Sequence, residues 1–246
     1  MEIVFKNSSQ KFKVPDGVIS GIYSDSNFFS SFKVYSINGV RVTKKNRVNS
    51  LKDISIIKND IDLSLFNTLE EYMNYYIEVN NLNLKDPYKK ILGSLKIVSL
   101  KENVLHKSIS SLSSTERCLA SLALSLLNNP KELIFVNYFD FFDVKLEKKI
   151  YRLLMELNDK YNIGIILLTR DVEKLYKYAS YSIIITSNYF KEGDTKEVFQ
   201  DAPLLIQNNI EVPDTVLFTY KAREMGAGID YHRDVRDIIK DIYKHV

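Results

Sequence analysis

Short apolar runs alternate with amphipathic stretches through the middle of the chain, and this alternation predicts its architecture. Apolar strands are expected at 133–136, 165–169 and 182–186, with helical periodicity over 145–161 and 172–178 between them. Short apolar strands that alternate with helices are typical of a parallel sheet covered by helices on both faces.

The first third of the chain has a different pattern, made of short β-rich segments separated by polar turns. It predicts strands at 2–5, 11–14 and 18–23, with the turn Pro15-Asp16-Gly17 between the last two. A first helix is expected over 30–38, followed by a basic loop over 41–47.

Two helix starts carry a capping-box pattern, in which a Ser or Thr precedes a Glu by three residues. Thr68 and Glu71 open one helix, and Ser113 and Glu116 open another that should run to Asn128. With a further helix over 87–98, these segments suggest a helical subdomain at about 64–128. After Pro203 the character changes, and 206–246 should form a small helical appendage.

Composition narrows the class of protein. The chain has 246 residues, 45% of them hydrophobic, which is enough for a sizeable core. Its net charge of +3 gives little attraction to nucleic acid, and its single cysteine fits a reducing compartment. The apolar runs are too short to span a bilayer, and no signal segment is evident. These features predict a cytoplasmic protein, soluble or peripheral, that neither binds nucleic acid nor inserts directly into a membrane.

Several motifs then follow one another in a recognisable order. Leu112-Ser113-Ser114-Thr115-Glu116 resembles the LSGGQ-type signature of ATP-binding-cassette (ABC) ATPases, and Asn129-Pro130-Lys131 precedes the next strand as in that family. Asp143 falls at the D-loop aspartate, and residues 168–171 at the switch-histidine motif. Residues 192–199 and the tail with Gly226-Ala227-Gly228 are most similar to the ATPase subunits of energy-coupling-factor (ECF) transporters.

This resemblance implies an α/β fold of the P-loop nucleotidase type. Its parts would be a parallel sheet flanked by helices, an N-terminal antiparallel β-subdomain and the helical subdomain that carries the signature. The ATPase-like domain would cover 1–205, and 206–246 would be a helical extension that pairs two ATPase subunits. The protein would lie on the inner face of the cell membrane, bound to a transmembrane coupling subunit.

The chain's own nucleotide site departs from the family pattern. The P-loop segment, 24–31, lies in a stretch with no glycine between Gly21 and Gly39. Glycine is what lets backbone N–H groups curl around phosphates. Ser30 replaces the phosphate-binding lysine, while Ser31 keeps the hydroxyl type that binds Mg²⁺; we favour the interpretation that both only cap a helix. The altered positions are Ser24, Asn27, Phe29, Ser30, Ser31, Lys58, Val136, Asn137 and Arg170.

These replacements bear directly on phosphoryl transfer. Val136 and Asn137 stand where the family has two acids, Arg170 where it has the switch histidine, and Lys58 where it has the Q-loop glutamine. An amide cannot accept a proton from the attacking water, and valine cannot support a metal shell. We therefore predict a pseudo-ATPase without catalytic residues, without a metal site and with no cofactor bound at its own site.

The signature segment is better preserved and suggests a composite site with a partner. Ser113, Ser114, Thr115, Glu116 and Asp143 would contribute to ATP and Mg²⁺ held by the partner's P-loop. In the alternative interpretation, Ser113 and Glu116 form only a capping box that needs no ligand. Asp143 would then be an exposed, solvated acid. Both interpretations stay open.

Two functions follow from this pattern. In the first, the chain is an inactive transporter subunit that pairs with an active ABC ATPase and donates its signature helix. In the second, the fold is a non-catalytic scaffold or regulatory interaction protein, which the Phe-rich stretch 138–142 favours. An enzyme with other chemistry in the vacated pocket has little support, because no paired acids, Ser-His or Cys-His arrangement stands out.

Overall fold

The computed structural model describes residues 1–6, 11–24, 33–58 and 66–245. The chain divides into two compact units. The first comprises Met1 and Ser36–Ile165, and the second Glu2–Tyr35 and Ile166–Val246. Across the described ranges, no helix is both long enough and apolar enough to cross a lipid bilayer.

The strands form two sheets, ordered β2-β1-β4-β5 and β10-β9-β3-β8-β7-β6. β4 and β8 are each divided between the two units. The bounds are β1 Ile3–Lys6, β2 Lys11–Val14, β3 Ile19–Ser24, β4 Lys33–Ile37, β5 Val40–Arg41, β6 Ile54–Lys58, β7 Glu132–Val136, β8 Gly164–Leu168, β9 Tyr181–Ile185 and β10 Phe190–Asp194.

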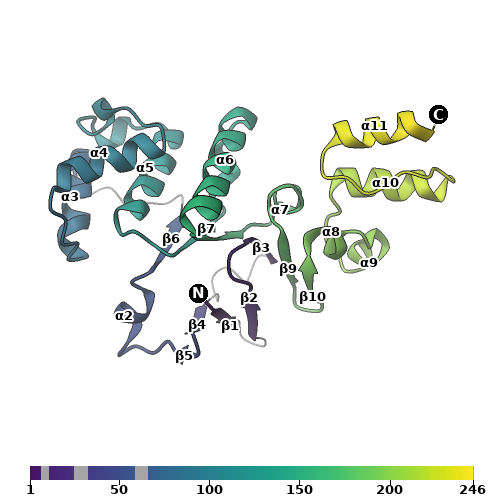
Figure 1. Ribbon diagram of the computed structural model, residues 1–246, viewed down its shortest axis with the longest axis horizontal. Helices are drawn as coiled ribbons and strands as arrows, with labels where there is room; N and C mark the ends of the chain where they lie inside the picture. The colour runs from purple at the N-terminus through teal and green to yellow at the C-terminus, as the bar shows by residue number, and fades with distance from the viewer. Residues whose placement is uncertain (7–10, 25–32, 59–65, 246) are drawn as a thin grey trace. The chain divides into compact units, whose positions relative to one another are not determined.

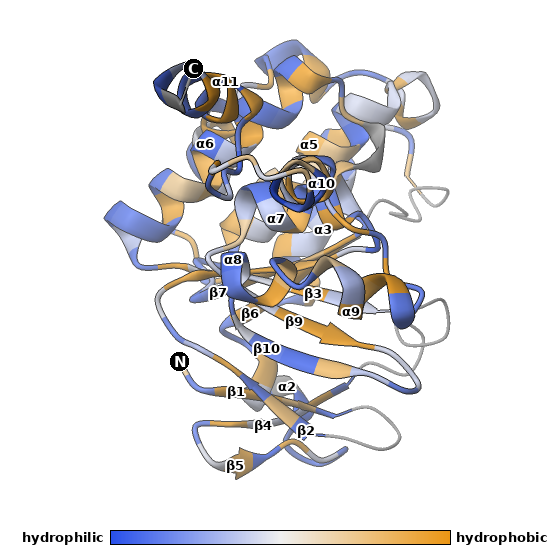
Figure 2. Ribbon diagram, turned by 90° about the vertical axis from the view of Figure 1, so that its right-hand side faces the viewer, coloured by the Kyte–Doolittle hydropathy of each residue, from blue (hydrophilic) through white to orange (hydrophobic). Residues whose placement is uncertain are grey.

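In the second unit, β1 and β2 form an antiparallel hairpin, and β3 pairs with β9 in parallel. β9 in turn pairs antiparallel with β10, so the larger sheet is mixed. Figure 2 shows the hydrophobic colour along β9, whose residues Ile183, Ile184 and Ile185 are all buried. Helix α7 (Val172–Tyr178) packs on β3 at Gly21, where a Cβ atom would lie 2.5 Å from Leu175 Cδ2 and 3.0 Å from Ala179 Cβ.

The first unit contains a parallel β6–β7 pair and the main helices (Figure 1). These are α2 Arg47–Leu51, α3 Leu69–Val79, α4 Pro87–Ile97, α5 Ser114–Leu127 and α6 Val144–Tyr161, with the 3₁₀ turns η1 Glu102–Val104, η2 Ile109–Ser111 and η3 Tyr138–Phe141. α5 is the central helix, because every residue from Cys118 to Leu127 is buried and α3 and α4 both pack on it. The buried Tyr138 hydroxyl donates a hydrogen bond to the Cys118 carbonyl at 2.7 Å, which ties the segment after β7 to α5.

The tail is a compact helical appendage within the second unit. It follows α8 (Thr195–Phe199) and α9 (Ala202–Gln207) and consists of α10 (Asp214–Glu224) and α11 (Val235–His245). Ala222, Ile229 and Ile238 form its small core. The Arg223 guanidinium donates to the Ile229 carbonyl at 2.7 Å, and this hydrogen bond closes the turn at Gly226 that follows α10.

Most predicted elements are confirmed, including the helix starts at Thr68 and Ser113. At the first of these, the Glu71 carboxylate accepts from the Asn67 N–H at 2.9 Å rather than from the N–H of the cap residue. The prediction of a helix over 30–38 is wrong for the described residues, because 33–37 form strand β4. The reason is the pair Asn38-Gly39, whose positive φ values of 48° and 77° form a tight turn into β5.

Replacing Gly21 by alanine should destabilise the second unit. The added methyl group would crowd Ala179 and Leu175, and overpacking of this kind costs about 1–3 kcal/mol. The matched control is Gly93→Ala in α4, where a Cβ atom meets nothing within 4 Å. That change should raise the free energy of unfolding by about 0.5–1 kcal/mol. Urea denaturation measures both, and equal effects of the two substitutions would contradict the assigned packing of α7 on β3.

Candidate functional site

The predicted site residues fall into two groups, one in each unit, and some lie outside the described residues. Asn27, Phe29, Ser30 and Ser31 belong to the segment 25–32, which the structure does not describe. Ser24 and Arg170 lie in the second unit. Lys58, Val136, Asn137, Asp143 and the segment 113–116 lie in the first.

In the second unit, Ser24 and Arg170 lie near the carboxyl ends of neighbouring strands. Ser24 is the last residue of β3 and is paired with Ile185. Arg170 follows β8 and is exposed, and the preceding Thr169 donates its N–H to the Ile22 carbonyl at 3.1 Å. Ser24 Oγ is buried, and no hydrogen-bond partner for it lies among the described residues.

In the first unit, the register of β6 and β7 brings two predicted positions together. Lys58 and Val136 are direct partners at the carboxyl ends of these parallel strands. Ligands of α/β folds bind at this edge of the sheet. Asn137 follows in the left-handed conformation, with φ 47° and ψ 38°, and is half-buried. An aromatic group then fills the space beyond β7: the ring of Tyr138 lies 5.0 Å from that of Phe135 and 5.2 Å from that of Phe142.

The signature segment forms a complete capping box at the start of α5. Ser113 Oγ accepts the Glu116 N–H at 3.1 Å, and the Glu116 carboxylate accepts the Ser113 N–H at 2.9 Å. The Ser113 hydroxyl also lies 3.1 Å from the same carboxylate and donates to it. Ser113 and Ser114 are exposed and Thr115 is half-buried. The first-turn N–H groups of Ser114 and Thr115 have no role within the helix and remain available to a ligand.

Two basic residues that the sequence pattern did not single out flank this helix start. Lys107 Nζ lies 2.7 Å from the Glu116 carboxylate, and the Arg117 guanidinium donates to the Leu112 carbonyl at 3.2 Å. The hydrogen bond from Lys107, together with that from the Ser113 backbone, holds the pKa of Glu116 below its ordinary value. Lys107 is nine residues before Glu116, a spacing with no helical or turn signature, so no local pattern could have revealed it.

Asp143 serves as the N-cap of α6, since its carboxylate accepts the Leu146 N–H at 2.8 Å. It is exposed, as is the next residue, Val144. Ser113 and Asp143 therefore both lie at the exposed amino ends of helices. Such ends favour anions, because their N–H groups are unpaired and the helix dipole is positive there.

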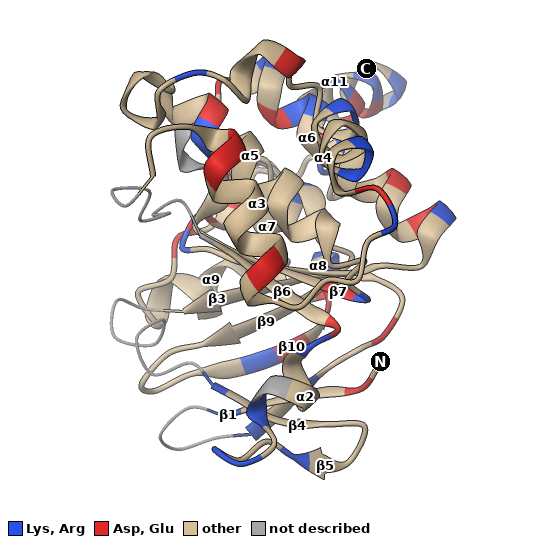
Figure 3. Ribbon diagram, turned by 90° about the vertical axis from the view of Figure 1, so that its left-hand side faces the viewer, with Lys and Arg blue, Asp and Glu red and all other residues tan. Residues whose placement is uncertain are grey.

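Aromatic residues of the N-terminal strands belong to the core. Phe5 and Phe12 are buried and stacked with ring centroids 5.7 Å apart, so neither can stack on an exposed nucleotide base. Among the described residues, no three His, Cys, Asp or Glu side chains are grouped to hold a metal ion. Charged residues of both signs are spread over many elements in Figure 3. Burial raises the pKa of the Cys118 thiol to about 11, which leaves it protonated and unreactive.

Comparison with solved structures assigns the fold. The chain matches CbiO1 from Clostridium perfringens, part of the ABC transporter complex cbiONQ, with a TM-score of 0.67. The two sequences are 19% identical over 89% of this chain and 98% of that one. The protein therefore has the ABC ATPase fold, with its antiparallel β-subdomain and its mixed sheet covered by helices.

Sequence relatives point in the same direction. The chain is 23% identical over 208 residues to the energy-coupling factor transporter ATP-binding protein EcfA2 of Mycoplasma mobile. It is 23% identical over 216 residues to EcfA1 of Ureaplasma parvum. These alignments cover 82% and 86% of this chain, and 67% and 72% of the relatives. No family model matches the chain.

Glu116→Gln should make the free energy of unfolding less dependent on pH under acidic conditions. A carboxylate whose folded-state pKa lies below its ordinary value of 4.5 stabilises the fold above that pH. This contribution is lost as the pH falls through the folded-state pKa. The variant should therefore lose less unfolding free energy than the native chain between pH of about 6 and about 3. The control is Glu78→Gln, because Glu78 makes no ion pair within the described residues. If Glu116→Gln loses as much unfolding free energy on acidification as the native chain, Lys107 does not stabilise the Glu116 carboxylate as described.

Proposed function

We propose that this chain is an ABC-ATPase-like subunit of an ECF-type or related ABC transporter that does not hydrolyse ATP at its own site. It pairs with an intact ATPase subunit and with a transmembrane coupling subunit. The similarity to EcfA proteins and to CbiO1 supports the transporter assignment. The observation that carries the inactive part is the end of β7, where the fold offers Val136 and Asn137 at the edge that would need two carboxylates.

The chain's contribution to a partner's ATP site would come from the amino end of α5. This helix has 14 residues, and its exposed first turn offers the N–H groups of Ser114 and Thr115 and the hydroxyl of Ser113. Arg117 adds a positive charge beside it, whereas the charge of Lys107 is balanced by Glu116. These groups suit a phosphate oxygen. When bound, Mg-ATP would be held chiefly by the partner, and Asp143 would lie at the subunit contact.

The tail supports pairing through its surface. On α11, Val235, Ile239 and Tyr243 follow one another at intervals of four and are 58%, 46% and 79% exposed. Ile238, three residues after Val235, is buried, so the exposed side chains form the outer edge of the apolar stripe of this helix. Large exposed apolar groups in a row indicate an interaction site. We propose that this face pairs with the partner's tail.

A second candidate function is a scaffold without a composite ATP site. It is favoured by one observation, the donation of the Ser113 hydroxyl to Glu116, which completes the local hydrogen bonding without a ligand. In that case α5 would need its cap only for stability.

Ser113→Ala separates the two candidates. The purified chain alone should show no ATP turnover. In a complex with an intact ABC ATPase subunit from the same genome, Ser113→Ala should lower the ATPase rate about tenfold or more. The reason is the loss of a hydroxyl that donates to the partner's phosphate.

The control for this experiment is Thr68→Ala, which removes the equivalent cap from α3. It should lower the free energy of unfolding by about 1 kcal/mol, as loss of the Ser113 cap should. The ATPase rate of the complex should stay within about twofold of the native rate. Equal rates in both variants would favour the scaffold. Turnover by the isolated chain would contradict the inactive site.

Ile239→Asp should weaken subunit pairing. Burying an isoleucine contributes about 1.5–3 kcal/mol, so its loss should raise the dissociation constant about tenfold or more. Lys240→Ala, at the next position of the same helix, should leave the constant unchanged within about threefold. Analytical ultracentrifugation of the complex measures both. Pairing that is insensitive to Ile239→Asp would exclude this face of α11 from the interface.

A further inference from the structure

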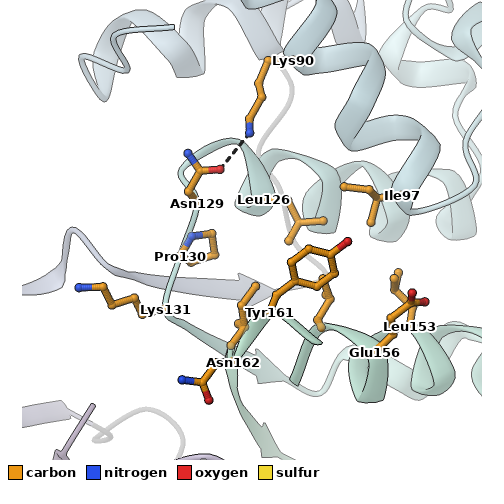
Figure 4. A pocket seen from close by; sticks show the side chains of 12 residues that line it. Lys90, Ile97, Leu126, Asn129, Pro130, Lys131, Leu153, Glu156, Tyr161 and Asn162 are labelled. Carbon is orange, nitrogen blue, oxygen red and sulfur yellow. Dashed lines mark hydrogen bonds between the residues drawn. The ribbon is translucent and has the colours of Figure 1, made fainter. Parts of the chain in front are cut away.

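A half-open cavity of about 550 Å³ lies in the first unit (Figure 4). The carboxyl-terminal parts of α5 and α6 form its walls together with α4, and the two segments that lead into β7 and β8 complete it. Cavities that hold small molecules in proteins are typically about 300–1,000 Å³ and are mostly apolar with a few placed polar groups. This cavity has that size and that composition.

The cavity lies away from the edge of the sheet where nucleotides bind. Asn129-Pro130-Lys131 precedes β7, and Asn162-Ile163 precedes β8. The Gly164 N–H donates to the Lys131 carbonyl at 2.8 Å and joins the two segments. Both therefore lie at the amino ends of these strands, whereas Val136 and Asn137 lie at the carboxyl end of β7. A ligand here would be separate from the ATP chemistry.

One end of the cavity carries a positive charge that is not neutralised. Lys90 is half-buried and donates to Asn129 Oδ1 at 2.9 Å, and within the described residues it has no carboxylate at ion-pair distance (Figure 4). Two N–H bonds of its ammonium group remain for a ligand. The other charged groups of the lining are paired, Lys131 with Asp53 at 3.0 Å and Glu156 with Lys160 at 2.7 Å. The cavity therefore offers one cation to an anionic ligand.

The rest of the cavity is apolar. Leu126 and Leu157 form a buried floor, and Ile97 and Leu153 lie at its sides. The Tyr161 ring stands in the middle of the view in Figure 4, is 66% exposed, and presents a flat surface to any group that enters. An aromatic or branched apolar body of a ligand would remove these side chains from water.

We propose that this cavity binds a small monocarboxylate with an aromatic or branched apolar body. The carboxylate would lie against Lys90 and the Asn129 amide, and the body would lie between Tyr161 and the leucines. A monoanion fits better than a phosphate dianion. The reason is that only one of the described lining cations is unpaired, since Lys131 and Glu156 are each held in an ion pair.

The test uses 2-naphthoate and its uncharged analogue, 2-naphthalenemethanol, titrated into the full chain by calorimetry. Naphthoate should bind at one saturable site, at least about tenfold more tightly than the alcohol. Lys90→Met should remove this difference. Lys89→Met, at the neighbouring exposed position of α4, should preserve it.

A second variant tests the location independently of charge. Leu153→Trp would fill the apolar part of the cavity and should abolish binding of both compounds. Circular dichroism establishes that the variant is folded; if it is not, the Lys90 pair alone decides. Equal affinities for acid and alcohol, retention of the preference in Lys90→Met, or the lack of any saturable binding to the native chain would each overturn the proposal.

Discussion

Hydrogen bonds to the Glu116 carboxylate determine where α5, the central helix of the first unit, begins. The carboxylate accepts hydrogen bonds from the Ser113 N–H, from the Ser113 hydroxyl and from Lys107. The following turns of α5 are buried on every side and receive the Tyr138 hydroxyl at Cys118. A shift of this helix start would therefore be transmitted to the packing of α3 and α4 and to the exit of β7. Interiors packed in this way do not absorb such a shift locally.

The same interaction limits what Ser113 can do for a partner. A serine hydroxyl has one proton, and here that proton is donated to Glu116. To donate to a phosphate oxygen it would have to leave the carboxylate, which Lys107 and the Ser113 N–H would continue to satisfy. The exchange is thus inexpensive, because Glu116 keeps two of its three donors. The N–H groups of Ser114 and Thr115 need no such exchange.

Sequence reasoning succeeded where the determinants are local. Capping residues, apolar strands and the periodicity of α6 are read within a few positions, and the structure has each of them. The helix prediction is wrong at 33–37, because the turn Asn38-Gly39 directly follows and pairs this segment with β5 as a strand. The partner of Glu116 and the whole cavity could not be predicted, because Lys90, Leu126 and Tyr161 are brought together only by packing of separate helices.

The backbone conformation after β7 bears on the proposed loss of ATP hydrolysis. Asn137 has a left-handed conformation that asparagine tolerates better than most residues, because its short side chain bonds locally. A glutamate in its place would meet a steric cost of about 1 kcal/mol or would have to change the turn. The next residue, Tyr138, is buried, contacts the ring of Phe142 and donates to the Cys118 carbonyl, so a change of the turn would disturb this packing. The proposed loss of catalysis would then reside in backbone and packing as well as in side-chain type, so that restoring a carboxylate alone would not restore a geometry for the attacking water.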